Sequence, residues 1–284
     1  MNCKVILSVN EDVFIEYANA IKLSLEELGH DAEVVGCKIG GIPLKEGDIN
    51  IVTRAFRPYH SKGVGIQIMF QSEELWHSRD SGVYDPRSNA SLWHRTLEMY
   101  KDNSELPNKA GYNVHWCPYG YSSAFETDLP EVEEDIDILF FGSSNSLRDE
   151  TWMEIAGHPN MKDKKMLNLQ DHTYGIERDK YIMRSKIVIN LKYTPRWSYP
   201  PLRALLTQCK KKMFMCHNPN GGRDPFINGK HFIEFDNVNH FAELCNEWLE
   251  NNSRRKEFAI NAYEDIKENH TFTEHLATAL KGII

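Results

Sequence analysis

One stretch of the chain places basic side chains beside a predicted helix start. Residues 185–190 (SKIVIN) form an apolar, β-branched run of the kind that is buried in a parallel sheet. Pro200 and Pro201 then open a predicted helix that carries Arg203 in its first turn. The unpaired N–H groups of a helix start attract anions, and a guanidinium binds a diphosphate through parallel hydrogen bonds. This order of residues predicts a phosphate pocket of a nucleotide site, at the end of a sheet.

The loop between this strand and this helix adds further cations and aromatic rings. Lys192 and Arg196 supply positive charge beside the predicted phosphate pocket. Tyr193, Trp197 and Tyr199 can stack on a base or a sugar, although aromatic side chains near a domain interface often serve packing alone. We therefore expect Lys192, Tyr193 and Arg196 to contribute to nucleotide binding.

A second predicted strand, residues 136–141 (IDILFF), runs directly into a glycine turn. The N–H groups of Gly142 and Ser143, with Arg148 close behind, can contact a phosphate; the alternative is a plain connection between strand and helix. A complete G-x-G-x-x-G fingerprint and its downstream acid are missing from the turn, which argues against a nicotinamide-dependent enzyme. We expect Ser146 to cap the following helix.

Composition limits the class of protein. A length of 284 residues is comfortable for two domains. The net charge of −8 argues against a protein that coats nucleic acid, although a local basic cleft remains compatible with it. The sequence has no apolar run of about 18–20 residues, and its start lacks a signal-peptide core. Six scattered cysteines favour reduced thiols in a cytoplasmic protein. The lysine triplet 210–212 is typical of a solvated helix end.

Strands and helices alternate along both halves of the chain. Predicted strands are residues 4–9, 32–35, 48–52, 65–70, 114–117, 136–141, 165–169, 186–190, 212–216 and 231–235. Predicted helices are residues 14–28, 91–100, 177–184, 202–209, 241–250, 253–268 and 271–280, the last opened by a capping box at Thr271 and Glu274. This pattern predicts an α/β fold of two Rossmann-like domains that face each other across a cleft.

We place the domain boundaries where composition changes. The predicted N-terminal Rossmann-like domain is residues 1–125, and the acidic stretch 126–135 is a linker. Residues 136–270 form the predicted C-terminal, nucleotide-binding domain. Residues 271–284 are a final helix that we expect to cross back to the N-terminal domain.

Several segments in this order resemble the GT-B glycosyltransferases, specifically the branch with a CgeB-like, group-1-like C-terminal domain. The resemblance is carried by Arg203 at the head of its helix and by the segments 116–121 (WCPYGY), 135–143 (DIDILFFGS), 186–191 (KIVINL) and 269–272 (NHTF). It extends over about residues 112–280 and is weak over residues 1–110. In these enzymes the N-terminal domain binds the acceptor and the C-terminal domain binds the donor.

One departure from the family pattern concerns the donor ribose. The family's helix commonly reads Arg-x-x-Glu, with a glycine further along, but here Leu206 takes the glutamate position and Lys211 the glycine position. Another carboxylate such as Glu234 or Asp236 replaces the missing one, or the donor binds in an unusual way, or donor binding has been lost.

The resemblance implies a metal-independent transferase that moves a sugar from a nucleotide-diphosphate donor, a UDP-sugar, to a hydroxyl acceptor, with no tightly bound cofactor. The expected donor-binding residues are Gly142, Ser143, Arg148, Lys192, Tyr193, Arg196, Arg203 and Glu234. The acceptor is open: a small molecule, a glycan, a protein or modified DNA.

An inverting transfer needs a base to deprotonate the acceptor hydroxyl, and parallel sheets bind ligands beyond the carboxyl ends of their strands. Asp12 follows the first predicted strand, while Glu74 and His77 follow the strand that ends at residue 70. We expect these residues to be catalytic, although a helix cap or a solvated acid is the alternative for each. Arg54 and Arg57 are expected to bind the acceptor.

Three other functions remain open at this point. A phage-type enzyme that glycosylates hydroxymethylated bases in DNA would place arginines 54, 57, 79, 87 and 95 along a basic groove. A non-catalytic module that binds a nucleotide or a glycan would explain Leu206. A sugar-nucleotide epimerase can share the same architecture, because fold does not fix function.

Overall fold

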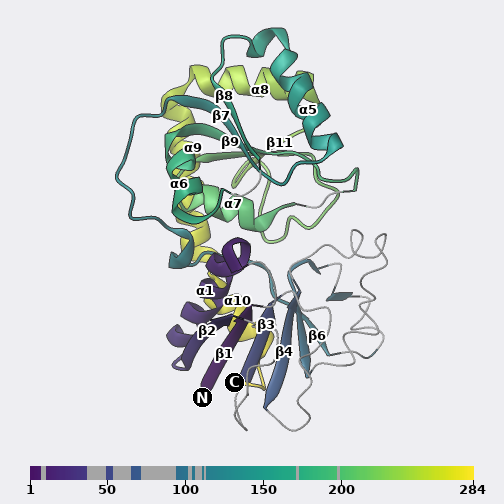
Figure 1. The fold of residues 1–284 in the computed structure, drawn as a ribbon, viewed down its shortest axis with the longest axis vertical. Helices are drawn as coiled ribbons and strands as arrows, with labels where there is room; N and C mark the ends of the chain where they lie inside the picture. Colours follow the sequence, from purple (N-terminus) through teal and green to yellow (C-terminus); the bar gives the residue numbers. More distant parts are fainter. Residues whose placement is uncertain are drawn as a thin grey trace. The chain divides into compact units, whose positions relative to one another are not determined.

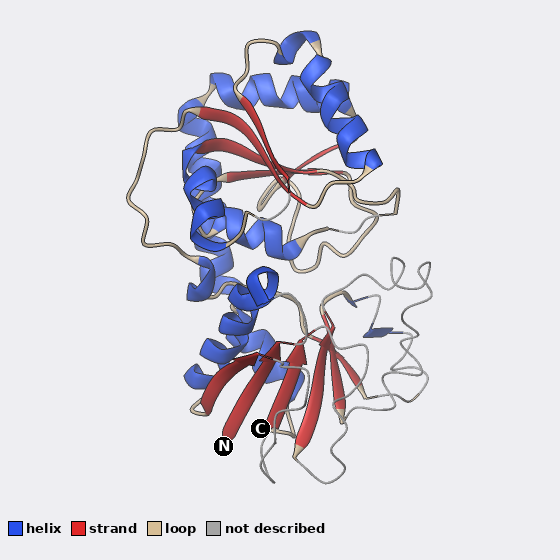
Figure 2. Ribbon diagram, viewed as in Figure 1, coloured by secondary structure: helices blue, strands red, loops and turns tan. Residues whose placement is uncertain are grey.

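The computed structural model divides into two compact units (Figures 1 and 2). Unit 1 comprises Met1–Ala124 together with His270–Ile284, and unit 2 comprises Phe125–Asn269. The structure describes residues 1–7, 11–36, 49–53, 65–71, 94–101, 104–105, 111, 113–170, 173–196 and 199–284. No helix among these residues is long and apolar enough to cross a membrane.

Unit 1 is built on a parallel sheet with the strand order β2-β1-β3-β4-β5-β6. Its strands are β1 (Asn2–Leu7), β2 (Asp31–Gly36), β3 (Ile49–Thr53), β4 (Ile66–Gln71), β5 (Arg95–Glu98) and β6 (Val114–Trp116). The helices α1 (Glu11–Glu27) and α10 (Phe272–Leu280) pack against each other in this unit. Apolar side chains such as Val5, Ile51 and Ile68 fill the strands because both faces of a parallel sheet are covered.

The C-terminal segment completes the core of unit 1. Phe272, at the start of α10, packs with the buried rings of Phe70 and Tyr119 at centroid distances of 6.0 and 5.9 Å. At the other end of α10, Arg95 Nη1 donates hydrogen bonds to the carbonyl oxygens of Ala279 (2.7 Å) and Lys281 (3.0 Å). These bonds satisfy carbonyl groups that a helix end leaves free. Residues 270–284 therefore belong structurally to unit 1.

The helix predicted over residues 91–100 is wrong in its described part. Residues 95–98 form β5, which pairs with β4 on one side and β6 on the other. All four residues of the strand are buried. Arg, Leu and Glu are good helix formers, but intrinsic propensity is a weak determinant of structure, so pairing in the middle of a sheet overrides their local preference.

Unit 2 contains a second parallel sheet, with the strand order β11-β10-β9-β7-β8. Its strands are β7 (Ile136–Gly142), β8 (Met166–Gln170), β9 (Ser185–Asn190), β10 (Met213–His217) and β11 (Ile233–Phe235). Its α-helices are α5 (Ser146–Gly157), α6 (Gly175–Arg184), α7 (Pro201–Gln208), α8 (Val238–Glu250) and α9 (Asn252–Asn269). The predicted α/β class with two Rossmann-like sheets is confirmed.

Helices cover both faces of this second sheet (Figure 1). Phe140, Ile189 and Met215 point into a core shared with α5 and α8. Since side chains alternate along a strand, their neighbours point to the other face, where α6, α7 and α9 pack. Asn190 and Cys216 therefore lie on the α7 face, at the carboxyl ends of β9 and β10.

The start of α5 differs from the prediction by one residue. Asn145, and not Ser146, is the N-cap: its Oδ1 accepts a hydrogen bond of 3.0 Å from Arg148 N. Asparagine caps at least as well as serine, so the preceding residue took this role. The predicted N-cap of α10 is confirmed, because Thr271 Oγ1 accepts a hydrogen bond from Glu274 N at 3.3 Å. The same hydroxyl donates to the Glu274 carboxylate at 2.9 Å.

Candidate functional site

The candidate site lies at the carboxyl ends of the strands of unit 2. Gly142 ends β7, Asn190 ends β9, and Cys216 is the penultimate residue of β10. In parallel α/β sheets, ligands bind beyond these strand ends. The loop 191–200 and the start of α7 follow directly from β9, so the predicted basic loop and the predicted helix start meet here.

Arg203 occupies the first turn of α7, two residues after Pro201 at the helix start. Its Nη1 donates a hydrogen bond to the side-chain oxygen of Asn190. The guanidinium carbon lies 5.5 Å and 5.4 Å from the ring centroids of Phe140 and Phe141. A Cβ at Gly142, which has a φ of +139°, would overlap Arg203 Nη2. The Arg203 guanidinium is thus held by the amide of Asn190 and by two phenylalanine rings, and the absence of a side chain at Gly142 leaves room for it.

Arg148 joins the glycine turn to the loop that follows β9. Its Nη1 donates to Ser143 O at 2.7 Å and its Nε donates to Leu191 O at 3.0 Å. Its guanidinium carbon lies 4.9 Å from the ring centroid of Tyr193, whose carbonyl oxygen accepts a hydrogen bond of 2.6 Å from Asn145. Ser143, Arg148 and Tyr193 were predicted from two separate segments, and the fold brings them together.

The site carries uncompensated positive charge. Within the described residues Arg203 has no carboxylate partner, and its buried Nε has no hydrogen-bond acceptor. The pKa of Arg203 lies well below its usual value, first because burial disfavours the charged form, and then because of the nearby charges of Arg148 and Arg178. A buried cation without a counter-ion is unfavourable, and a bound anion would relieve it.

Arg178, in α6, is a cation that the sequence analysis missed. Its guanidinium lies 5.7 Å from the ring centroid of Phe141, and its Nη2 pairs with Asp179 at 2.8 Å. Both side chains are nearly completely buried. Its charge is therefore compensated in part by Asp179, a carboxylate that also pairs with Lys210, whereas Arg203 has no carboxylate partner among the described residues. A helix that reads Arg-Asp gives no signal in sequence that it faces an anion site.

The remaining residues of the basic loop lie further along the site. Burial, followed by the charge of Lys192, lowers the pKa of His217 at the end of β10. Lys192 therefore extends the positive charge toward β10. Arg196 is exposed, and Trp197 lies outside the described residues. Asn220 Nδ2 donates to Pro195 O at 2.7 Å, which ties this loop to the segment between β10 and β11.

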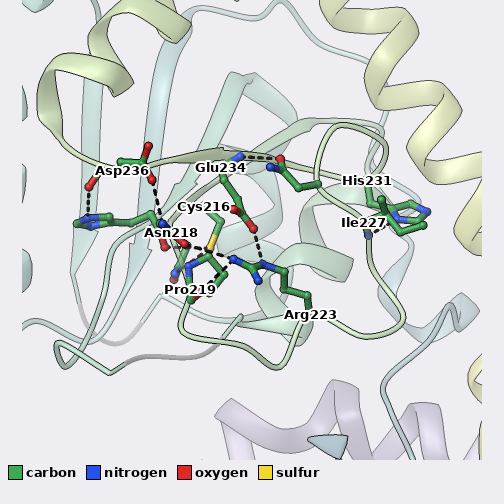
Figure 3. Close-up of polar contacts among 11 residues, drawn as sticks. Cys216, Asn218, Pro219, Arg223, Ile227, His231, Glu234 and Asp236 are labelled. Carbon is green, nitrogen blue, oxygen red and sulfur yellow. Dashed lines mark hydrogen bonds and ion pairs between the residues drawn. The ribbon is translucent and has the colours of Figure 1, made fainter.

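Glu234 lies on β11, where Figure 3 shows its carboxylate against Arg223. Arg223 also donates to Asn218 Oδ1 at 3.3 Å and to Pro219 O at 3.2 Å, so it organises the start of the segment between β10 and β11. In the sheet register, Cys216 is aligned with Glu234 on one side and with Asn190 on the other. The carboxylate of Glu234 thus belongs to the row of side chains that begins at Asn190.

The sequence analysis missed Arg223 although the two preceding residues are glycines. Gly221 and Gly222 have φ values of +121° and +66°, which mark a tight turn. A charged residue directly after such a glycine turn could have indicated from the sequence that Arg223 is a candidate site residue.

The structure also shows why the two departures in α7 are tolerated. Leu206 is only 3% exposed and packs in the core, so no carboxylate is available at that position. Lys211 follows the helix with a φ of +53°, the left-handed conformation in which glycine is usual. Its N–H donates to Gln208 O at 2.8 Å, as helix ends of this kind require. The backbone at Lys211 therefore has the conformation that is usual for glycine, although the residue is a lysine.

The interpretation of the lysine triplet as a solvated helix end is wrong for two of its members. Lys210 is buried, with its Nζ 2.8 Å from Phe125 O and 3.1 Å from a carboxylate oxygen of Asp179. Lys212 pairs with Glu134 at 2.6 Å. Buried ammonium groups need such partners. Both lysines thereby fasten the segment 125–134 to the rest of unit 2.

The predicted acceptor and catalytic residues are not placed by the structure. Arg54, Arg57, Glu74 and His77 lie outside the described residues, as does the side chain of Asp12 at the start of α1. A described acid, Glu98, ends β5 at the carboxyl edge of the unit 1 sheet and is buried. Burial first, and then the nearby Tyr119, Cys117 and Glu98, raise the pKa of Tyr17. Glu98 was missed because residues 91–100 were predicted as a helix.

Comparison with known proteins identifies the fold. No protein-family profile matches the sequence. No curated protein matches it either. An alpha-glucosyltransferase solved in complex with UDP is similar at a TM-score of 0.70, with 10% identity over 99% of this chain and 100% of that one. An alpha-glucosyltransferase bound to UDP and a 13-mer DNA with a central A:G mismatch is similar at 0.66, with 10% identity and the same coverage.

Two further solved structures share the same architecture. The T4 phage BGT in complex with UDP and Mn²⁺ has a TM-score of 0.60 and 11% identity over 99% of this chain and 100% of that one. The Anabaena protein Alr3699/HepE in complex with UDP has a TM-score of 0.63 and 9% identity over 99% of each chain. Similarity over both units, at these identities, is a similarity of fold. The chain therefore has the two-domain GT-B fold of the glycosyltransferases.

Proposed function

We propose that the protein is a glycosyltransferase that moves a sugar from a UDP-sugar to a hydroxyl acceptor. One observation carries this proposal: a partly buried guanidinium, that of Arg203, has no carboxylate partner in the described part of the chain and lies at a helix start beyond the strand ends. A diphosphate supplies the missing negative charge. The UDP complexes of the structural neighbours support the choice of nucleotide.

The residues of the site take distinct roles in this proposal. Arg203 and the free N–H groups at the start of α7 bind the diphosphate, and Arg148 adds charge while holding the glycine turn against the loop. Gly142 and Ser143 let the backbone approach the phosphates. As the sugar leaves, negative charge builds up on the diphosphate, and these fixed cations stabilise it. Lys192 and Arg196 contribute at longer range.

Glu234 is the proposed partner of the donor ribose, in place of the carboxylate that Leu206 lacks. Neighbouring strands lie about 4.8 Å apart. Glu234 is two strands away from Asn190, so the backbones of these residues are about 10 Å apart, a separation that suits a nucleoside attached to a diphosphate. Arg223 holds the carboxylate in place. Tyr193 offers a ring beside the same loop.

The acceptor side rests on the expectations from sequence together with one described carboxylate. Asp12, Glu74, His77 and Glu98 are the candidates for the base that deprotonates the acceptor hydroxyl. Arg54 and Arg57 remain the proposed acceptor-binding residues. We further propose that the reaction needs no metal; adding EDTA or Mn²⁺ to the transfer assay tests this directly, and the Mn²⁺ in the T4 phage BGT complex makes the second arm necessary.

A specific observation favours modified DNA as an alternative acceptor. The alpha-glucosyltransferase that matches this chain from end to end was solved with a DNA duplex. DNA binding would show a steep loss of acceptor affinity with rising salt, because phosphate contacts release counter-ions. A small or glycan acceptor would show little salt dependence. The other alternative, a non-catalytic nucleotide-binding module, is supported by Leu206 and is excluded by any turnover.

The first test is binding of UDP, GDP, CDP, ADP and dTDP, measured by calorimetry and by melting temperature. A nucleotide at ~100 times its Kd adds about 2.7 kcal/mol of stability. We expect UDP to bind selectively to the wild type and weakly to Arg203→Ala. Arg254→Ala is the matched control, because Arg254 is an exposed arginine on α9 that pairs with Glu247. Absence of binding by every nucleotide would refute the proposal.

A further inference from the structure

Asn190 is a neutral side chain that contacts Arg203, a cation with no carboxylate partner among the residues that the structure describes. It is completely buried, at the end of β9. Its Oδ1 accepts the hydrogen bond from Arg203 Nη1, and its Nδ2 lies 3.5 Å from Cys216 Sγ. A guanidinium only donates hydrogen bonds, so the amide oxygen must face Arg203 and the amide nitrogen must face the sulfur. Both ends of the amide are therefore used.

An aspartate would fit the same space and would make a stronger contact. A carboxylate facing Arg203 would form a charge-assisted hydrogen bond, which is about twice as strong as a neutral one. It would also compensate a cation that burial and the charges of Arg148 and Arg178 disfavour. For stability alone, an acid is the better residue at this position. The chain has the amide instead.

Compensation of the charge would damage an anion site. A carboxylate next to Arg203 would occupy its donors and repel an incoming diphosphate. The neighbouring Arg178 shows the other solution within this unit, because it pairs at 2.8 Å with the carboxylate of Asp179, which it shares with Lys210. The contrast between these two arginines, one buried and paired with an acid, the other partly buried and held by an amide, distinguishes a structural cation from a binding cation.

We propose that Asn190 is a positioning residue that holds the Arg203 guanidinium in place without neutralising it, and thereby sets the affinity of the site for diphosphates. The inference rests on the proposed function, since it assigns a role within the same donor site. It predicts that two substitutions of Asn190 distinguish the effect of the position of the Arg203 guanidinium from the effect of its charge. Asn190→Asp keeps the shape of the side chain and neutralises the positive charge of Arg203, whereas Asn190→Ala removes the hydrogen bond to Arg203.

The experiment measures two quantities, the melting temperature without ligand and the calorimetric Kd for pyrophosphate and for UDP. For Asn190→Asp we expect an unchanged or higher melting temperature, together with a Kd raised by about 30- to 100-fold. The dependence of the affinity on salt should also weaken, because one cation is neutralised. For Asn190→Ala both the melting temperature and the affinity should fall, since Arg203 loses its support.

Asn160→Asp is the matched control. Asn160 is exposed, in the short helix before β8 and hence near the amino end of the sheet, so this substitution adds the same charge away from the site. It should leave the Kd for pyrophosphate within about twofold of wild type.

The outcomes separate this inference from the proposed function. If the wild type binds pyrophosphate and UDP but Asn190→Asp binds them equally well, the role of Asn190 is refuted while the donor site stands. If Asn190→Asp loses affinity only in proportion to a loss of melting temperature, the residue is merely structural and the inference fails. If the wild type binds diphosphates but transfers no sugar, the proposed function fails and the inference about Asn190 survives. No binding by the wild type refutes both.

Discussion

Replacing Arg203 by methionine should separate the stability of the fold from the affinity of the site. The guanidinium carbons of Arg203 and Arg148 lie 5.5 and 5.4 Å from the same ring, that of Phe140, so they are at most about 11 Å apart. At an effective dielectric constant of about 20, two unit charges at this distance repel by ~1.5 kcal/mol or more. Arg203→Met removes this repulsion and the cost of burying the charge, while keeping an apolar stem over the rings.

The same substitution also removes favourable contacts. The hydrogen bond to Asn190 is lost and leaves a buried amide oxygen, at a cost of about 1–3 kcal/mol. The two ring contacts contribute about 0.5–1 kcal/mol each. Gains and losses are therefore of similar size, and the free energy of unfolding should change by no more than about 1–2 kcal/mol. For a chain of this size that corresponds to a shift in Tm of roughly 2–8 °C in either direction.

Binding of the nucleotide should change far more. Two charge-assisted hydrogen bonds to a diphosphate are worth about 3–4 kcal/mol, so the Kd for UDP should rise by about 100- to 1,000-fold. The assay is calorimetric titration of UDP into wild type and variant, paired with thermal unfolding of both without ligand. A Kd within fivefold of wild type would refute the assignment of Arg203 to the diphosphate. A fall in Tm well beyond 8 °C would refute the view that this cation is poorly compensated in the free protein.

Three further substitutions test other features of the structure. Gly142→Ala should weaken UDP binding at least ~10-fold and cost about 1–3 kcal/mol, because a Cβ there overlaps the Arg203 guanidinium and glycine alone tolerates that backbone freely; unchanged calorimetric affinity would contradict it. Lys211→Gly should raise the free energy of unfolding by about 0.5–1 kcal/mol in urea titrations without altering UDP affinity, since its φ is +53°; a destabilised variant would show that the lysine side chain matters more than the backbone. The pKa of Asp265 is lowered to about 2. Burial raises this pKa, but hydrogen bonds from Lys230, His231 and Asn269 together lower it by more. The folded-state pKa is thus below the unfolded value of about 3.9, so the stabilisation is present above pH ~4 and is lost as the pH falls toward 2. In Asp265→Asn the free energy of unfolding should depend less on pH across that window, and an unchanged slope would refute the assignment.

The sequence predicted the architecture of the site well and its detailed contacts poorly. The parallel strands and the helix start at Pro201 follow from local rules, because β-branched runs and proline punctuation act over a few residues. The position of Arg203 at the head of α7 came with them. The contact of Arg203 with Asn190 joins residues separated by 13 positions and depends on how β9 and α7 pack. No local sequence pattern predicts this contact.

Two errors have the same physical origin. The residues of β5 were predicted to be helical because their own preferences do not indicate a strand. They adopt the strand conformation only because they pair with β4 and β6. The lysine triplet reads as a solvated helix end until the fold places Asp179 and Glu134 beside two of its members. In both cases partners distant in the sequence decide the outcome, so a window of a few residues cannot contain the answer.

The discontinuity of unit 1 has a consequence for the order in which the protein is made. Residues 125–269 form unit 2 without a break, and they leave the ribosome before residues 270–284. Domains fold as units during synthesis. Until residues 270–284 emerge, the rings of Phe70 and Tyr119 lack Phe272, and the Arg95 guanidinium lacks the carbonyl groups at the end of α10. We expect nascent chains stalled at the point where residues up to 269 have left the ribosome to contain a folded, protease-resistant unit 2 beside an incomplete unit 1. The first part of the chain is then the last to finish folding.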